Sequence, residues 1–576
     1  MGSIAEYSVP QETEAVFRNG ILNNPLMKDL SGDLKSLAQN VKFEGSSKPS
    51  VPINWRFAES ISALKAFEAT MLNRLLLKKY NVDPVNITIN TDHASLFYMS
   101  PLAAQYLGTD GKLVPMAFVS AWSEEMKRMF PDEDKHRCSA SLHRMLLTNM
   151  CKTKDGRCYQ IHGGINPDPV FTALGLPQDG KPDDTYDTVV ERVQKAVAQL
   201  DAKELDDLMN ETYRQAGAVA WSSDEYFASD QGKAASKTGL YEITKDTHSS
   251  QPATWWPENQ SMPSSPQRPL AGLKVVDLSR IIAGPLISRG LAEMGASVMR
   301  VTSPNVTDMS VLHQDLNWGK WSCHLDLNKE EDKEKLRALI READVVVDGY
   351  RPGVMKKHGF GQQDILNMVK SRDRGIIHVK ENCYGWHGPW QHRAGWQQIS
   401  DAACGVSLAY GQAMGHDEAV TPAFPNSDYC AGVSGTTAVL DALMRRAEHG
   451  GSYSVGVALN YYSQWLVRSC GTYPEPVWKE LWERHGSPVF RHNHNMAYTV
   501  PAILQLLQMH DAGTLFQPHF FEPRTSKAVG GTFMVVKPIA QFSNAAVELR
   551  YNVGTRGSGV DEPIWPSDLS VEKVKN

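Results

Sequence analysis

Short apolar runs alternate with helical patterns throughout the second half of the chain. Residues 273–278 form a short, mainly apolar run, residues 283–294 carry apolar side chains at helical spacing, and residues 296–301 form a second candidate strand. This strand, helix, strand order predicts a parallel sheet, because a crossover helix joins parallel neighbours. The alternation continues with helix 331–343, strand 345–348, helix 363–370, strand 376–379, a helical stretch near 398–411, a long helix near 430–448 and strand 453–459. The pattern predicts a doubly wound, Rossmann-like α/β domain that binds ligands beyond the carboxyl ends of its strands.

The first half repeats part of this pattern. Residues 60–75 have helical periodicity and precede a β-type run at 85–89, as the long helix near 430–448 precedes the strand at 453–459. An internal repeat is one interpretation and a chance likeness is the other, because a helix followed by a strand is a common pair.

Breaks in the periodicity divide the chain into five expected segments. Four prolines and many Ser, Gln and Asn residues between 244 and 268 indicate a linker. The expected segments are an N-terminal extension (1–50), a partial repeat of the large domain (51–140), a small α+β domain (141–243), the linker (244–268) and a large α/β domain with a C-terminal return (269–576).

Composition narrows the expected partners and location. A formal net charge of −6 over 576 residues gives no broad positive field for nucleic acid or an anionic membrane. The eight cysteines contain no CxxC pair, so neither a zinc knuckle nor a disulfide framework is indicated. The first residues lack an apolar signal-peptide core, and no apolar run approaches the ~18 residues of a membrane span. We therefore expect a cytoplasmic protein that binds neither nucleic acid nor membrane.

Asp428 is the main candidate for chemistry. It lies at the start of the long helix, in the segment Pro-Asn-Ser-Asp-Tyr-Cys-Ala-Gly (425–432). An Asp just before a helix commonly caps it, which stabilises the helix by ~1 kcal/mol. A carboxylate at the end of an α/β sheet is also a candidate covalent nucleophile. Position alone leaves both interpretations open.

Several short motifs follow one another in a characteristic order around this residue. They are Pro-Leu-Ala-Gly-Leu-Lys-Val-Val-Asp-Leu-Ser-Arg (269–280), Ala-Gly-Pro (283–285), Leu-Ala-Glu-Met-Gly-Ala-Ser-Val (291–298), Ala-Asp-Val-Val-Val-Asp-Gly-Tyr-Arg-Pro-Gly-Val (343–354), Tyr-Gly-Trp-His-Gly-Pro-Trp (384–390), Ala-Gly-Trp-Gln-Gln (394–398) and the Asp428 segment. In this order and spacing, residues 269 to about 466 resemble the family III CoA-transferases. This CaiB/BaiF group also contains formyl-CoA transferase and α-methylacyl-CoA racemase.

The resemblance implies a CoA-transferase that uses Asp428 as a covalent acyl carrier. Its substrates would be an acyl-CoA thioester and a small carboxylic acid, with no permanently bound cofactor. The residues expected to contact CoA are Gly284, Arg300, Lys320, Arg351, Pro352 and Gly353. Solvated charges at strand ends are the alternative interpretation for each of the basic residues.

The order of the domains departs from the family. The small domain precedes the large one here, so the chain is either permuted or a fused pair whose first copy is reduced. Family members form interlocked dimers, so we expect either a homodimer or a monomer with an internal pseudo-dimer. In the internal repeat, the position matching Asp428 falls on or near Arg56. No carboxylate aligns with it, and one active site is expected.

Racemisation of an acyl-CoA α-carbon is the first alternative activity. The racemase branch uses a His-Asp step and a small-domain Glu, where this chain has Gln397-Gln398 and Asn166. Amides do not exchange protons near neutral pH, which disfavours two-base racemisation. A racemase would need another second base, such as His387 or His392.

A repurposed scaffold without CoA-transfer activity is the second alternative. Ile282 stands where some transferases carry Gln, and their glycine-rich active-site run is reduced here to Gly163-Gly164. No metal site is expected, because His492 and His494 lack both a third ligand and helical spacing.

Overall fold

The computed structural model describes residues 7–117 and 122–572, and a seven-stranded sheet lies at its centre. In spatial order, its strands are β11 (Lys320–His324), β10 (Ser297–Thr302), β9 (Lys274–Leu278), β12 (Val345–Asp348), β13 (Ile377–Asn382), β14 (Tyr453–Ala458) and β8 (Glu242–Lys245). The first six strands are parallel, and β8 runs antiparallel to β14. The strand order reverses between β9 and β12, which is where doubly wound sheets form a ligand crevice. The predicted mixed α/β fold with a parallel sheet is confirmed.

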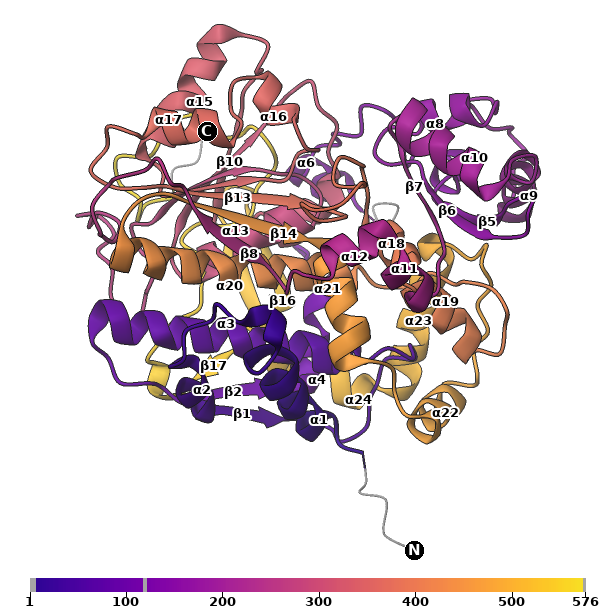
Figure 1. The fold of residues 1–576 in the computed structure, drawn as a ribbon, viewed down its shortest axis with the longest axis horizontal. Helices are drawn as coiled ribbons and strands as arrows, with labels where there is room; N and C mark the ends of the chain where they lie inside the picture. Colours follow the sequence, from indigo (N-terminus) through magenta and orange to yellow (C-terminus); the bar gives the residue numbers. More distant parts are fainter. Residues whose placement is uncertain (1–6, 118–121, 573–576) are drawn as a thin grey trace, which may run out of the picture.

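Helices cover both faces of this sheet (Figure 1). Helices α13 (Ala283–Glu293) and α20 (Asn426–His449) lie on one face, and α15 (Glu330–Glu342) and α17 (Gln362–Met368) lie on the other. Strand β12 begins with three valines because side chains on both of its faces are buried. Val345 and Val347 join the core under α20, whereas Val346 joins the core under α15. A strand covered on both faces favours apolar side chains at successive positions.

Two strands of the sheet fall outside the apolar pattern predicted from the sequence. Strand β11 contains the buried polar residues Lys320 and Ser322, and therefore shows no apolar run. Strand β8 spans the expected boundary between the small domain and the linker, and pairs with β14. The following segment also packs onto the large domain, where the buried Trp256 donates to the carbonyl of Ala271.

The N-terminal region adds two layers beneath α20. Helix α3 (Phe57–Tyr80) lies directly against α20, as Figure 1 shows. Below α3, β1 (Val41–Glu44) pairs in parallel with β2 (Ile87–Asn90), and β17 (Gln541–Phe542) pairs antiparallel to β2. The order of a long helix followed by a parallel strand is therefore the same in α3–β2 and α20–β14.

A separate small unit carries an antiparallel sheet of β5 (Asn149–Lys152), β6 (Cys158–His162) and β7 (Ala216–Val219). Helix α9 (Tyr186–Val197) covers this sheet, and the unit has its own apolar core. After β14, the chain forms α23 (Met496–His510) and then β15 (Phe521–Ser526) and β16 (Gly531–Val536), which join β3 (Gln105–Leu107) and β4 (Leu113–Pro115). Within the described ranges, no helix is both long and apolar enough to cross a membrane.

Candidate active site

Asp428 lies in the first turn of α20 and faces a cavity. The helix begins at Asn426, and Pro425 precedes it without making a side-chain cap. The half-buried Asp428 side chain lines the cavity, and no hydrogen bond or ion pair joins it to another described residue. The capping interpretation therefore has no supporting contact. Burial raises the pKa of Asp428 to about 7, because no donor stabilises the carboxylate.

The cavity has a volume of about 360 Å³, and distant parts of the chain form its walls. The large domain contributes Ile282, and the small unit contributes Ile165. Leu102 comes from the N-terminal region, and Val500 comes from α23. Asp428 is the only Asp or Glu among the described residues that line the cavity.

Other carboxyl groups lie close behind Asp428. Glu381 is near the end of β13, and burial followed by the charges of Asp428 and Asp348 raises its pKa to about 8. Burial also raises the pKa of Asp348, at the end of β12, to about 7. On α18 (Gln397–Ala403), Asp401 accepts a hydrogen bond from Gln397, and burial raises its pKa. These groups place Asp428 among acids that hold protons near neutral pH.

The switch point between β9 and β12 holds four of the residues expected to bind CoA. Arg351, Pro352 and Gly353 follow β12, and Gly353 has a φ of +88° at the start of α16 (Val354–Lys357). Gly284 lies in the first turn of α13, where an added Cβ would approach the Cβ of Ser279 to 2.6 Å. Close backbone approach therefore requires glycine at position 284.

A second arginine accompanies Arg351. Arg280 follows β9 and stacks its guanidinium 5.1 Å from the centre of the Tyr350 ring. Partial burial and the neighbouring charge of Arg280 lower the pKa of Arg351. Neither arginine forms an ion pair with another described residue, and Arg351 donates to the carbonyl of Arg214 at 2.9 Å. Two unpaired cations at a switch point suit an anionic ligand.

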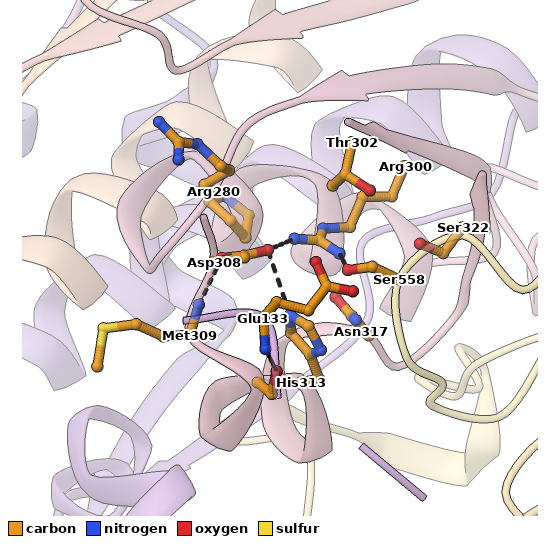
Figure 2. Close-up of polar contacts among 12 residues, drawn as sticks. Glu133, Arg280, Arg300, Thr302, Asp308, Met309, His313, Asn317, Ser322 and Ser558 are labelled. Atoms are coloured by element: carbon orange, nitrogen blue, oxygen red, sulfur yellow. Dashed lines mark hydrogen bonds and ion pairs between the residues drawn. The ribbon is translucent and has the colours of Figure 1, made fainter. Parts of the chain in front are cut away.

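Arg300 and Lys320 lie inside the protein instead. Arg300 is 2% exposed, pairs with Asp308 and donates to Ser558 at 2.9 Å (Figure 2). Lys320 is fully buried and pairs with Asp277 at 3.0 Å. Both charges are neutralised within the fold, and neither residue lines the Asp428 cavity.

The Arg300 cluster supports one wall of the cavity. Figure 2 shows Asp308 between Arg300 and His313, and Asp308 also accepts from the backbone N–H of Met309 at 2.9 Å. Met309 and Leu312, from the same segment, line the cavity. The ion pair therefore positions cavity residues.

Comparison with known proteins identifies the family. Residues 270–483 match the family described as CoA-transferase family III. The chain is 58% identical over its whole length to an acetyl-coenzyme A transferase, nodX, from Hypoxylon pulicicidum, and covers 96% of that protein. The chain belongs to the family III CoA-transferases. It is also 29% identical to an acyl-CoA transferase from Gibberella moniliformis, over 95% of this chain and 94% of that one. A solved CaiB/BaiF family protein from Brucella suis is 27% identical, with a TM-score of 0.32, over 35% of this chain and 55% of that one.

The residues considered for racemisation do not provide a second base in this CoA-transferase. Gln397 and Gln398 line the cavity, and their side chains are amides. His387 pairs with Glu242 at 2.7 Å, and His392 pairs with Glu211 at 3.1 Å. Neither histidine lines the cavity.

The remaining departures from the family surround the CoA-transferase cavity. Ile282 lines it beside Ile281, whose φ of +71° is rare for a β-branched residue. Gly164 also lines the cavity, whereas the Asn166 side chain accepts from the backbone N–H of Asp168. His492, which was considered as a metal ligand, instead pairs with Glu418 at 2.7 Å.

Sequence reasoning missed Arg280, Glu381 and, apart from Gly164, the cavity residues of the small unit, the N-terminal region and α23. Arg280 and Glu381 lie where predicted strands end, so the rule for parallel sheets gave a signal for both. Leu102 and Val500 gave no signal, because only the folded chain brings them to Asp428.

Proposed function

We propose that this CoA-transferase moves CoA from an acyl-CoA thioester to a carboxylic acid through a covalent intermediate on Asp428. One observation carries the proposal: among the described residues lining the cavity, Asp428 is the only carboxylate, and no described residue donates a hydrogen bond to its side chain. A carboxylate free of hydrogen bonds is a stronger nucleophile than a solvated one, and the cavity would hold the thioester beside it.

The proposed reaction begins with attack by an Asp428 oxygen on the thioester carbonyl. The C–S bond breaks, CoA thiolate leaves, and a mixed anhydride forms between the acyl group and Asp428. The thiolate then attacks the Asp428 carbonyl carbon, releasing the first acid as its carboxylate and leaving an aspartyl-CoA thioester. The acceptor carboxylate attacks this thioester and releases thiolate. Attack of the thiolate on the new acyl carbonyl forms the product acyl-CoA and regenerates the Asp428 carboxylate.

We place the phosphates of CoA at the switch point of the sheet. Arg280 and Arg351 supply unpaired positive charge there, and the backbone turn at Gly353 leaves open space. Ile281 follows Arg280 directly and lines the cavity, so the chain connects the two positions. The acyl group would then enter the cavity while the phosphates stay at the sheet edge. Arg300 and Lys320 take no part in this proposed site.

We further propose that the N-terminal region replaces a second subunit, giving an internal pseudo-dimer. The packing of α3 on α20 supports this, as does the contribution of Leu102 to the Asp428 cavity.

Trapping with hydroxylamine tests the covalent step. Incubation with acyl-CoA and hydroxylamine should convert the Asp428 side chain to a hydroxamate, detected by mass spectrometry of the peptide that contains it. The Asp428→Asn variant should lose both this product and CoA transfer, by at least about a thousandfold. Transfer that survives in Asp428→Asn would overturn the proposal.

A further inference from the structure

The cavity beside Asp428 has apolar walls along most of its lining. Residues that show this include Leu102, Ile165, Ile282, Leu312, Met496 and Val500. They come from the large domain, the small unit, the N-terminal region and α23, so the apolar character does not arise from one core alone. Apolar walls favour a ligand that buries hydrocarbon surface.

Arg144 is the only lysine or arginine among the described residues that line the cavity. It is 5% exposed, and its Nη2 pairs with Asp168 at 2.5 Å. Its three nitrogens also donate to the backbone carbonyls of Arg137, Gln178 and His136, at 2.7 to 3.0 Å. The charge is therefore neutralised by the protein and is not available to pair with a ligand anion.

His162 does not supply a positive charge either. Its ring stacks on Trp396 at a centroid distance of 5.0 Å, and its Nδ1 accepts from the backbone N–H of Gly164 at 2.9 Å. Nδ1 therefore carries no proton, and burial lowers the pKa of the ring to about 3. His162 is neutral at physiological pH.

Most neutral polar side chains in the lining already have protein partners. Thr421 donates to Gln160 at 3.0 Å, and Asn495 donates to the carbonyl of Thr148 at 3.0 Å. Two buried atoms of the lining lack partners, the Trp396 indole N–H and the amide oxygen of Gln397, whose Nε2 donates to Asp401. They offer one donor and one acceptor, which suits a carbonyl or hydroxyl but does not neutralise an anion.

We infer that the cavity selects an acyl group that is largely apolar and uncharged, and that it excludes acids carrying a second carboxylate. This substrate class rests on the proposed role of Asp428. A second carboxylate in the cavity would lose its hydration, find no free cation and lie near the charge of Asp428. An apolar chain of the same length instead gains from burial.

A matched pair of thioesters tests the inference. Hexanoyl-CoA and adipoyl-CoA share CoA and a six-carbon acyl chain, but only adipoyl-CoA ends in a carboxylate. The kcat/KM for labelling of Asp428 with hydroxylamine should be at least about tenfold higher for hexanoyl-CoA, which corresponds to about 1.4 kcal/mol of discrimination. Equal or faster labelling by adipoyl-CoA would overturn the inference while leaving the proposed role of Asp428 intact.

Acetyl-CoA separates the remaining outcomes. Labelling by acetyl-CoA without labelling by hexanoyl-CoA would also overturn the inference, because the cavity would then admit no longer chain. No labelling by acetyl-, hexanoyl- or adipoyl-CoA would contradict the proposed function itself, and the inference would fail with it.

A charge placed at the mouth of the cavity gives a second test. Ala497 lines the cavity from the exposed side of α23, so a longer side chain is accommodated there without disturbing a core. Ala497→Lys should raise the ratio of adipoyl-CoA to hexanoyl-CoA labelling at least about threefold over Ala497→Met, a neutral variant of similar length. An unchanged ratio would contradict exclusion by charge.

Discussion

Helices α20 and α3 each carry a carboxylate at the same position, but the surroundings of the two carboxylates are opposite in character. Both helices run 24 residues, and their third residues are Asp428 and Glu59. Each helix also leads into a strand of a parallel pair, and the two pack against each other. Asp428 faces a cavity and has no partner among the described residues, whereas Glu59 is fully buried.

The partners of Glu59 come from three parts of the chain. Tyr7 and Tyr473 donate to its two oxygens, with a distance of 3.2 Å for Tyr473, and Arg56 lies 3.8 Å away. Burial raises the pKa of Glu59, while Arg56 and the tyrosine hydroxyls oppose that rise. A carboxylate surrounded by donors has no free face for a substrate. The difference teaches that partners and access, rather than position on the helix, determine which carboxylate can react.

Replacing Asp428 should remove the destabilisation of the fold that its unpaired carboxylate causes. Its pKa of about 7 lies above the value of 3.8 for an ordinary Asp, so the folded state binds the proton more tightly than the unfolded state. The ionised group therefore destabilises the fold fully above pH 7 and does not do so below about pH 4. Asp428→Asn should raise the free energy of unfolding at pH 8 by up to about 4 kcal/mol.

Thermal unfolding at pH 8 and pH 4 measures this effect. The melting temperature of Asp428→Asn should exceed that of the wild type at pH 8, and the two should agree at pH 4. Equal melting temperatures at both pH values would show that the Asp428 carboxylate has stabilising contacts in the folded enzyme.

Replacing Glu59 should give the opposite result. In Glu59→Gln, Arg56 loses a neighbouring charge, and the hydroxyls of Tyr7 and Tyr473 compete for one amide oxygen. Although burial raises the pKa of Glu59, the loss of these hydrogen bonds should outweigh the relief of a buried charge, so the free energy of unfolding should fall by about 1–3 kcal/mol. The rate of CoA transfer per folded molecule should stay at the wild-type level, with the folded fraction measured by circular dichroism in the same samples. A selective loss of transfer with unchanged stability would assign Glu59 to the reaction.

The sequence predicted elements well where their burial is apolar. Strands β9, β12 and β14 follow short, mainly apolar runs, and α20 follows helical spacing, so the sheet could be predicted, although its strand order and switch point were not. Strand β11 was missed, because its buried Lys320 is accommodated by Asp277, 43 residues away in the chain. Local pattern does not reveal such long-range neutralisation.

Arg56 and Glu59 show how a small boundary error changes the interpretation of a site. The helical pattern predicted a start at residue 60, whereas α3 begins at Phe57. The first turn contains Glu59, so the predicted match to Arg56 missed the carboxylate by three residues. Caps and first turns carry weak periodicity, which is why helix ends are harder to predict than helix interiors.

Pro425 and Arg56 directly precede their helices, which suggests a way to make the two carboxylates alike. Pro425→Arg should place a cation beside Asp428, as Arg56 lies beside Glu59, and should lower the pKa and nucleophilicity of Asp428. At pH 8, hydroxylamine labelling should fall at least about tenfold relative to Pro425→Gln, a loss of about 1.4 kcal/mol. Equal labelling of the two variants would show that an added charge does not inactivate this position.

The smallest expected effect concerns Glu381, an acidic neighbour of Asp428. Only ionised Asp428 attacks the thioester, so labelling should increase as pH rises through about 7. Glu381 has a pKa of about 8, and Asp348, Asp401 and Cys383 also lie in this group of buried acids. Ionisation of Glu381 adds negative charge where the reaction develops an oxyanion, so labelling should decline again above about pH 8.

Glu381→Gln should keep the rise near pH 7 and lose the decline above pH 8. Its rate at pH 7 should stay within about threefold of the wild type, because Glu381 is mainly protonated there. Rates of hydroxylamine labelling from pH 5.5 to 9.5 measure both limbs, and Glu475→Gln, at an exposed residue, serves as the control for loss of one carboxylate. A decline that persists in Glu381→Gln would assign it to another group, such as Cys383. A rise that shifts away from pH 7 would instead show that Glu381 already carries charge when Asp428 ionises.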